Sequence, residues 1–325
     1  MDNKCKHVFR DGASCGERLH PGSKLCFWHD PKADKSGPEI REMIEEKHKR
    51  GETLESIILN GAQLENVRLL RANLHNAQFK RANLKNAHLF RADLTHANLY
   101  KAALQGANLK EAKLGEAELL GATLEETKLP HIGYGGHDGY TIRNEIEGTG
   151  HEKRGEFAQA REKYFEAEEI YRAIKRNLKN SGMSFAAGEF FFKEMVMNRK
   201  QMPFYSLSRF WSKLMSISTG YGEKPYRIIS LSLTYIVLSA MIFCCLGIRH
   251  TSGYFLQYSS SASLAENLAV FYDAMYFSFV TFTTLGYGDF TPVNSGKLFA
   301  VMEAYLGAFC ISLFSISTYK RYMDR

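Results

Sequence analysis

The residues with the most specific chemical potential have the sequence TTLGYGD and occupy positions 283–289. A dehydrated metal cation needs oxygen ligands in place of its water shell, and consecutive main-chain carbonyls that point to one axis can supply them. Such a backbone passes through left-handed conformations, which Gly286 and Gly288 adopt without steric cost. The Thr284 hydroxyl can act as the innermost ligand. The segment therefore predicts a filter that coordinates cations.

The sequence TTLGYGD closely resembles the selectivity filter of two-transmembrane potassium channels, with Leu285 at a position that often holds Val or Ile. The resemblance implies that Tyr287 braces the filter from behind. It also implies a gating hinge at Gly307, eleven residues after Gly296. One chain supplies one filter strand, and a closed ring of carbonyls needs four strands. We therefore expect a homotetramer that conducts K⁺ passively and is not an enzyme. The filter residues are then Thr284, Leu285, Gly286, Tyr287 and Gly288.

Two acidic residues, Asp289 and Glu303, are predicted to support the filter. Val280 stands where some of these channels have a glutamate that partners the filter aspartate, so Asp289 is expected to bond elsewhere. Glu303 lies inside an apolar segment, where ionisable groups are functional candidates by default. We favour a neutral or hydrogen-bonded Glu303 that supports the pore helix from behind, and a functional ionisable group is the alternative.

Apolar helices must hold this filter in a two-span pore domain over residues 224–325. Residues 227–248 and 297–319 are long enough, at about 1.5 Å per residue, to cross a hydrocarbon layer of about 30 Å. Residues 269–283 have the length and aromatic content of a re-entrant pore helix, whose C-terminal dipole end favours a cation. Residues 203–223 predict an interfacial helix on the lipid bilayer.

Basic residues flank the membrane segments on one side. Arg209, Lys213, Lys224 and Arg227 precede the first span, and Lys320, Arg321 and Arg325 follow the second. The positive-inside rule then places both termini in the cytoplasm of a plasma or inner membrane.

A second candidate site consists of three cysteines and a histidine with the spacing Cys-x9-Cys-x10-Cys-x2-His: Cys5, Cys15, Cys26 and His29. Thiolates and imidazole are the ligands that a structural Zn²⁺ prefers. Residues 1–30 are too few to bury a stable core without such a staple. We therefore predict zinc binding, with His7 and His20 as alternatives to His29, and free cytosolic thiols as the alternative to zinc.

The cysteine spacing resembles the Cys3His domain of plant growth-regulating factors. The Trp-Arg-Cys motif of that family is absent, because Ala13-Ser14 precede Cys15. The DNA binding of that family is therefore not carried over to this chain.

Residues 52–130 contain a large apolar residue at every fifth position, from Leu59 to Leu129, and a small residue usually precedes it by two. A period of five fits neither a helix nor a strand, but it fits a solenoid whose coils have four short faces. The sequence RANLHNAQFKRANLKNAHLFRADLTHANLY is closely similar to the pentapeptide-repeat family. This similarity implies a right-handed quadrilateral β-helix.

The early coils of this rod are basic: residues 68–101 contain seven Lys and Arg against one acidic residue, Asp93. This balance disfavours mimicry of DNA by an acidic surface, and a nucleic-acid partner is not expected. We expect a rigid spacer or docking rod. The alternative is a dedicated site for an unidentified cytoplasmic ligand or protein.

Three further segments connect these parts. Residues 31–51 form a charged connector that is helical in part, and the glycine-rich residues 131–154 predict a linker. Residues 155–202 predict an amphipathic helical hairpin that is split at Ser181-Gly182 and needs a partner surface. We expect this hairpin to be an adaptor between the rod and the membrane.

The average composition hides this organisation. A length of 325 residues, a mean hydropathy of −0.29 and a net charge of +7 are typical of a soluble protein, and six cysteines are too few for a disulfide scaffold. The residue order instead predicts a multi-domain membrane protein, with a β-helix, an α-helical linker and an α-helical tetrameric pore regulated through its N-terminal domains. The competing hypothesis is a membrane-tethered scaffold or nucleic-acid binder with a vestigial pore.

Overall fold

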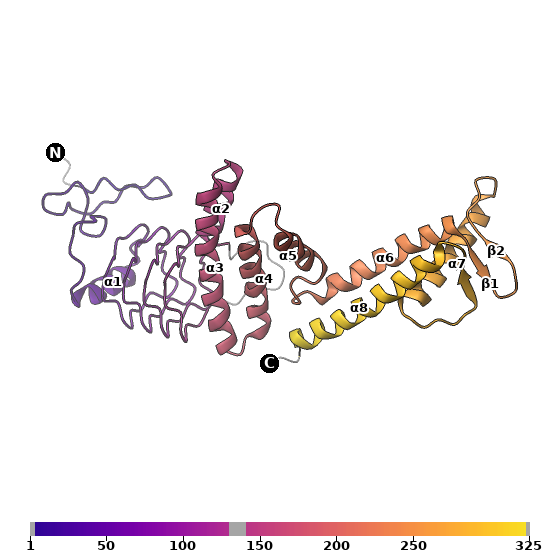
Figure 1. The fold of residues 1–325 in the computed structure, drawn as a ribbon. Helices are drawn as coiled ribbons and strands as arrows, with labels where there is room; N and C mark the ends of the chain where they lie inside the picture. Colours follow the sequence, from indigo (N-terminus) through magenta and orange to yellow (C-terminus); the bar gives the residue numbers. More distant parts are fainter. Residues whose placement is uncertain (1–3, 130–140, 323–325) are drawn as a thin grey trace. The chain divides into compact units, whose positions relative to one another are not determined.

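A computed structural model describes residues 4–129 and 141–322 of the chain (Figure 1). The chain divides into two compact units, Met1–Arg209 and Phe210–Arg325. The first unit contains the repeat and the helices α1 to α4, and the second contains α6 to α8 with a small β-sheet.

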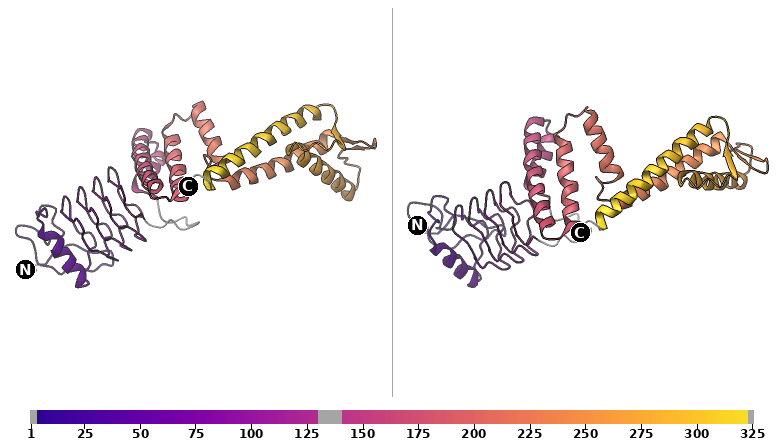
Figure 2. Two further views of the ribbon diagram at one scale, coloured as in Figure 1. Left: turned by 90° about the horizontal axis from the view of Figure 1, so that it is seen from below. Right: turned by 60° about the horizontal axis from the view of Figure 1, so that its bottom comes forward.

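Coils of twenty residues build the centre of the first unit (Figure 2). Parallel bridges join residues that are twenty positions apart, such as Ile58 with Gln78 and Gln63 with Asn83. Main-chain hydrogen bonds also join neighbouring coils, and the Leu59 N–H donates to the Gln78 carbonyl at 2.7 Å. The coil length agrees with the predicted periodicity, while the right-handed quadrilateral form stays a prediction.

The repeated large and small residues form the core of the rod. Leu84, Leu99 and the alanines between them, such as Ala87, have no exposed surface. Every fifth residue has a left-handed backbone, including Arg71 and Asn86 with φ of 57° and 55°. The sequence pattern does not predict this left-handed position, because Arg, Asn, His, Lys and Glu occupy it as well as Gly.

Helix α1, Glu39–Lys49, covers the first coil and lies within the predicted connector. The Glu45 carboxylate accepts a hydrogen bond from the Arg68 N–H at 2.8 Å, and His48 Nε2 lies 2.9 Å from the Leu70 carbonyl. These side chains occupy main-chain groups at the coil edge, which would otherwise be free to pair with another strand.

Helices α3, Phe157–Asn180, and α4, Ser184–Gln201, form the predicted hairpin and cover the last coil. The Asn177 side-chain amide donates to the Leu124 carbonyl of that coil. One hydrophobic core continues from the cysteines through the rod to α4. The partner surface that the hairpin needs is therefore the end of the rod.

The predicted linker over residues 131–154 is wrong where helix α2 lies, at Arg143–Lys153. Its Gly148 packs against α3 so closely that a Cβ atom there would meet the Tyr164 ring at 2.8 Å. This glycine permits close helix packing, whereas in the sequence it is typical of a flexible segment. Residues 130–140 of the predicted linker lie outside the described residues.

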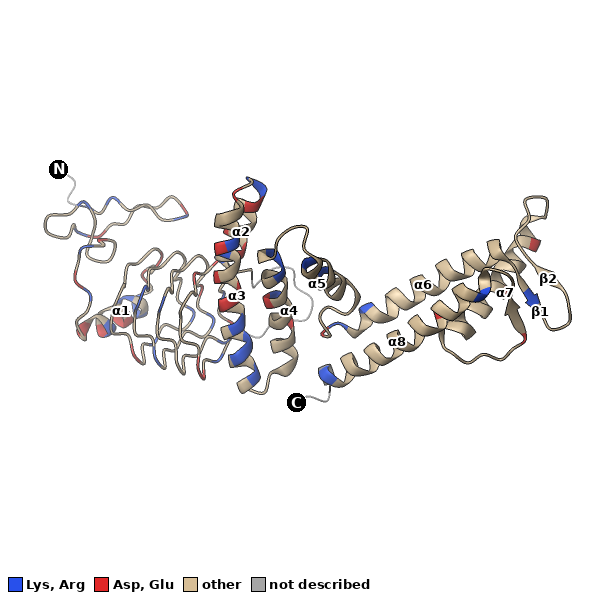
Figure 3. Ribbon diagram, in the orientation of Figure 1, with Lys and Arg blue, Asp and Glu red and all other residues tan. Residues whose placement is uncertain are grey.

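Two helices of the second unit are long and apolar enough to cross a membrane: α6, Pro225–Leu246, and α8, Gly296–Tyr322. They match the two predicted spans to within a few residues. Charged residues are sparse along both helices (Figure 3). Helix α7, Leu264–Phe282, packs against both of them through Phe243, Phe277 and Phe282.

The predicted pore helix begins at residue 269, but α7 begins at Leu264. The Ser263 hydroxyl accepts a hydrogen bond from the Glu266 N–H, and the Ser263 N–H donates to the Glu266 carboxylate at 2.7 Å. This capping box starts the helix before its apolar residues begin.

Helix α5, Leu207–Ser218, lies inside the segment predicted as an interfacial helix. It exposes large apolar side chains, which are Leu207, Phe210, Trp211, Leu214 and Ile217. Arg209 and Lys213 supply positive charge on the same helix. This amphipathic composition is typical of helices that lie in a membrane interface.

We expect Leu84→Ala to destabilise the first unit by about 2–5 kcal/mol, because the deleted atoms leave a cavity in a continuous core. Leu70→Ala is the matched control, because Leu70 is 47% exposed. Denaturant titration of residues 1–209, followed by far-UV circular dichroism, measures both free energies of unfolding. An equal loss in the two variants would contradict this account of the core.

Candidate ion-conducting and metal-binding sites

The end of α7 leads directly into the predicted filter. Thr284, Gly286 and Gly288 have φ angles of 59°, 56° and 79°, so left-handed residues alternate along the segment. Within the described part of the chain, the carbonyls of residues 284–288 accept no hydrogen bond. Five consecutive residues thus keep their carbonyl oxygens available to another ligand. The glycines were expected to adopt this conformation, and Thr284 adopts it as well.

The side chains of the filter segment lie on the surface of the second unit. Leu285 is 56% exposed and Tyr287 is 68% exposed. The described part of the chain leaves the Tyr287 ring largely uncovered, so any brace for this side chain has to come from outside the subunit. The bracing role of Tyr287 stays a prediction.

Asp289 bonds to a residue other than position 280. Its side chain accepts a hydrogen bond from the Tyr276 hydroxyl at 2.8 Å, and Tyr276 belongs to α7. Its main-chain carbonyl accepts from the Thr251 N–H at 2.9 Å. Asp289 therefore joins the end of the predicted filter to α7 and to Thr251, which lies in the segment between α6 and α7.

A three-stranded antiparallel sheet holds the segment after the filter. Strand β1, Ile248–His250, lies between β2, Phe255–Leu256, and β3, Phe290–Pro292. The sequence analysis missed this sheet. The turn at Gly253, between two segments with β-branched or aromatic residues, is the signal that could have revealed the hairpin.

Glu303 belongs to α8, and its side chain is fully buried where α8 faces α7. The Ser278 hydroxyl lies 2.6 Å from Glu303 Oε1 and 3.0 Å from the Ile236 carbonyl. Ser278 carries one hydroxyl proton, so it can donate to only one of these oxygens. A protonated Glu303 can donate to the Ser278 hydroxyl, and Ser278 can then donate to the Ile236 carbonyl of α6. Both short distances are hydrogen bonds in this arrangement.

Gly307 lies where α8 meets the last residue of α7. A Cβ atom at Gly307 would be 1.8 Å from the Phe282 carbonyl oxygen, so only glycine fits this contact. The close approach places α8 against the end of α7, two residues before the predicted filter. The hinge function of Gly307 stays a prediction.

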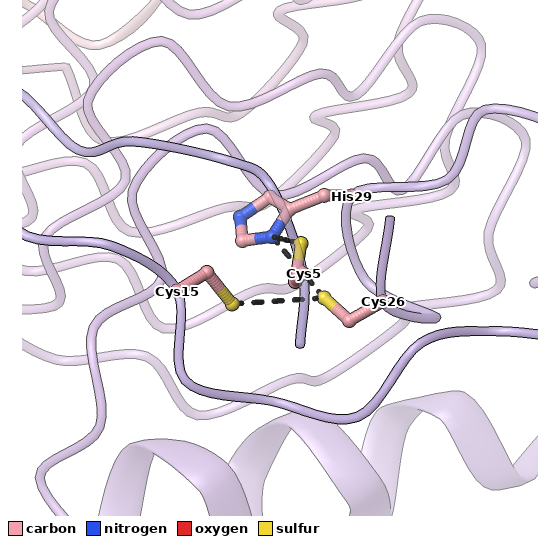
Figure 4. Close-up of side chains that lie close together, drawn as sticks. All are labelled: Cys5, Cys15, Cys26 and His29. Atoms are coloured by element: carbon pink, nitrogen blue, oxygen red, sulfur yellow. Dashed lines mark hydrogen bonds between the residues drawn. The ribbon is translucent and has the colours of Figure 1, made fainter. Parts of the chain in front are cut away.

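The predicted metal ligands converge in the first unit (Figure 4). Cys5, Cys15, Cys26 and His29 are all buried, and their ligand atoms lie within 4.8 Å of one another. Cys15 Sγ is 3.8 Å from Cys26 Sγ, and His29 Nδ1 is 3.7 Å from Cys5 Sγ and 3.2 Å from Cys26 Sγ.

These distances suit a tetrahedral ion. With Zn–S bonds of about 2.3 Å and Zn–N bonds of about 2.0–2.1 Å, two sulfurs are separated by about 3.8 Å, and a sulfur and a nitrogen by about 3.6 Å. Burial raises the pKa of Cys26 to about 12, so its thiolate needs a compensating cation inside the cluster. The cluster therefore could bind a metal.

The orientation of His29 is fixed by the rod. Its Nε2 lies 3.4 Å from the Glu55 carbonyl, which can only accept, so Nε2 carries the proton and Nδ1 is free for a ligand. The neighbouring Trp28 carbonyl accepts a hydrogen bond from the Ile58 N–H at 2.9 Å. The cluster is thus attached to the first coil.

The two alternative histidines lie outside the ligand set of the cluster. His7 stacks on His29 with ring centroids 4.0 Å apart, and His20 Nδ1 pairs with Asp30 at 2.9 Å. His7 thus packs on the His29 ring and His20 bonds to the residue after His29, so His29 is the histidine of the ligand set.

Comparison with known proteins assigns the two main parts of the chain. Residues 230–323 match the ion channel family, and residues 57–95 and 92–129 match pentapeptide repeats in eight copies. The chain therefore contains an ion channel domain and pentapeptide repeats. With the two apolar helices, the channel match indicates a membrane protein.

Individual relatives match only parts of the chain. Protein LctB of Geobacillus stearothermophilus is 41% identical over 49 residues, which cover 15% of this chain and 37% of LctB, so little more than a third of that relative is spanned. Rfr23, a pentapeptide repeat protein from the cyanobacterium Cyanothece 51142, is 40% identical over 24% of this chain and 54% of its own, with a TM-score of 0.24. The pentapeptide repeat protein alr5209 from Nostoc Pcc 7120 is 31% identical over 28% and 86%, with a TM-score of 0.24.

We expect Gly307→Ala to destabilise the second unit by about 1–3 kcal/mol, because the added methyl group forces α8 away from the backbone of α7. Gly296→Ala is the matched control on the same helix, since a Cβ atom there would meet Pro292 at an ordinary 3.4 Å. Thermal unfolding of the full chain in detergent compares the variants. A loss of similar size in Gly296→Ala would contradict the contact.

Proposed function

We propose that the chain is one subunit of a homotetrameric, potassium-selective channel. The observation that carries this proposal is the run of residues 284–288, whose carbonyls accept no hydrogen bond in the described chain and whose backbone alternates through left-handed conformations. The run follows α7 and lies between two helices that can cross a membrane, inside the region that matches the ion channel family.

The chemistry of conduction follows from the carbonyl oxygens. A K⁺ ion that leaves water loses its hydration shell, and rings of carbonyls from four chains replace those oxygens. The Thr284 hydroxyl adds the innermost ring, and the C-terminal end of α7 lowers the energy of a cation near its axis. Successive rings of similar strength let an ion bind and leave again, so transport is passive.

Several exposed surfaces support assembly into a tetramer. A single chain leaves Leu285 and Tyr287 uncovered, and α8 exposes Met302 and Tyr305. Filter carbonyls from one chain cannot surround an ion. Further copies of the subunit complete the rings and cover the Tyr287 side chain.

We place both termini in the cytoplasm. Lys213 and Lys224 precede the first span and Lys320 follows the second, so basic residues gather at the ends of α6 and α8 that are far from the filter. Helix α5 then lies in the headgroup layer, with Trp211 and its apolar neighbours in the lipid.

Glu303 and Asp289 act as filter supports in this proposal. A neutral Glu303 bridges α8 and α7 through Ser278, and Asp289 holds the other end of the filter through Tyr276. Gly307 is the proposed hinge of α8, since it lacks a side chain at the contact with α7.

We further propose that Cys5, Cys15, Cys26 and His29 hold a structural Zn²⁺. When bound, the ion would cross-link the chain at Cys5, Cys15 and the Cys26–His29 segment and compensate the charge of the buried thiolates. His29 positions its Nδ1 through the bond from Nε2 to the Glu55 carbonyl, which attaches the metal site to the rod.

Regulation is proposed to enter through the N-terminal domains at the loop between α5 and α6. The Ser317 hydroxyl donates to the Gly222 carbonyl at 2.7 Å, and Lys320 pairs with Glu223 at 2.6 Å. The C-terminal end of α8 is thus attached to the loop that follows α5, so a movement of α5 would pull on α8.

Liposomes that contain the purified chain should release K⁺ down its gradient, while Na⁺ flux stays at the level of empty liposomes. Cation flux assays with matched gradients measure both. Gly286→Ala should abolish the K⁺ flux, because an added Cβ disfavours the left-handed backbone at this position. Equal fluxes of Na⁺ and K⁺, or no flux from a folded tetramer, would contradict the proposal.

Metal analysis of the purified chain should find about one Zn²⁺ per subunit, and Cys15→Ala should lose most of it, because three ligands hold a structural ion poorly. Cys245→Ala is the matched control, since Cys245 is exposed and lies outside the cluster. An unchanged zinc content in Cys15→Ala would contradict the assigned ligands.

Deletion of residues 1–200 should change the open probability of the channel under at least one condition that affects the full chain, because the deletion removes the rod and its helical cap. Planar-bilayer recordings of the two proteins, over the same range of pH, salt and voltage, make the comparison. Identical open probabilities throughout would overturn the regulatory role.

A further inference from the structure

A cavity of about 310 Å³ lies between residues 4–30, here called the cysteine-rich segment, and the first coils of the rod. Four basic residues line it, and they come from separated parts of the sequence: Arg10, Arg71, Arg91 and Lys113. Two carboxylates, Glu55 and Asp93, also line it. The cavity therefore carries an excess of positive charge at a junction between two structural parts.

The carboxylates are already occupied by other groups. Glu55 accepts a hydrogen bond from the Arg10 main-chain N–H at 2.7 Å. Asp93 accepts from the Thr95 N–H at 3.0 Å and from the Thr95 hydroxyl. It lies 3.9 Å from the Lys113 ammonium, which is the long end of the range for an ion pair. Both acids keep their negative charge in these hydrogen bonds, so the four cations and two carboxylates of the lining leave a net charge of +2 with His75 neutral.

The arginines differ in what pairs with them. Arg91 Nε donates to the Glu111 carboxylate at 2.5 Å, and Glu111 lies one coil farther along the rod. The guanidinium groups of Arg10 and Arg71 make no ion pair or hydrogen bond with any described residue. Arg71 precedes Arg91 by one coil, so its neighbour at the same corner is another cation, about 4.8 Å away along the rod.

The lining also indicates which part of a ligand is recognised. Ala72 is the single apolar side chain among the described lining residues, so the cavity offers little contact to a ring system. Several guanidinium groups around one space suit a tetrahedral oxyanion, which offers several acceptor oxygens to bidentate donors. A volume of about 310 Å³ exceeds that of one phosphate group and leaves space for a small organic substituent.

We propose that this cavity binds a small phosphate-bearing anion, either inorganic phosphate or a phosphate monoester. The ligand contacts Arg10 of the cysteine-rich segment together with Arg71 and Arg91 of the rod. It therefore fastens the cysteine-rich segment to the first two coils. This inference concerns binding to the cytoplasmic part and is independent of ion conduction.

The test is isothermal titration calorimetry on the full, zinc-loaded chain in detergent, with inorganic phosphate and glycerol 3-phosphate as separate probes. Ionic strength is held constant with chloride, and the two probes distinguish a free phosphate from an esterified one. We expect saturable binding of at least one probe at about one site per chain, and a higher unfolding temperature at saturation. Absence of saturable binding with both probes overturns the proposal.

Arg71→Gln and Arg10→Gln should each weaken the binding by roughly ten- to hundredfold, since each removes a charge-assisted hydrogen-bond donor. Arg81→Gln is the matched control. Arg81 has the same left-handed turn, with φ of 58°, and the same kind of cationic neighbour, Lys101, but it lies outside the cavity lining. Circular dichroism confirms that each variant is folded.

Two outcomes would overturn the site. An equal loss of affinity in Arg81→Gln would assign the binding to the general positive charge of the coils. Binding of a short oligonucleotide at constant ionic strength, without binding of either small phosphate, would make the basic coils a nucleic-acid surface instead.

Discussion

Main-chain N–H and C=O groups at the edge of a β-structure need partners, and this requirement explains what surrounds the rod. Its first coil meets side chains of α1, including Glu45 and His48, and its last coil meets Asn177 of α3. Both caps use polar side chains that reach main-chain atoms. The helices therefore finish the rod and join its core, and they are more than connections between domains.

The channel domain satisfies the same requirement on one side of the predicted filter and leaves it open within the filter segment. The segment after the filter pairs with β1, and the Asp289 carbonyl accepts from Thr251. Between α7 and Asp289, residues 284–288 leave their carbonyls without a donor in the described chain. Unpaired carbonyls at membrane depth are tolerated where water or ions reach them, so these carbonyls coincide with the proposed conduction path.

Periodicity and composition predicted the elements that depend on local rules. The five-residue repeat, the two apolar spans and the left-handed glycines of the filter are of this kind. Gly148 misled the prediction, because a glycine that permits close packing against Tyr164 looks the same in the sequence as one in a flexible linker. Likewise, the strands of the small sheet are two or three residues long, too short for a periodic pattern, and β3 pairs with a segment about forty residues earlier.

The metal ligands show where spacing suffices and where it does not. Spacing and residue type identified Cys5, Cys15, Cys26 and His29, which the fold brings together. The choice among three histidines depends on Glu55, whose carbonyl lies beside His29 only after the first coil has formed. The sequence analysis counted Arg71 among the basic residues of the early coils but missed its proximity to Arg10, because about sixty residues of chain separate the two.

Each coil of the rod contains twenty residues, so the length of the rod changes in fixed steps. Because bridges always join a residue to the one twenty positions later, inserting or deleting one whole coil changes the separation of α1 and α3 by about 4.8 Å and leaves their relative orientation nearly unchanged. A change of five residues instead turns the helical cap by about one side of the coil with little change in length. Insertions of twenty residues thus change the length of the rod, and insertions of five residues change the orientation of its helical cap.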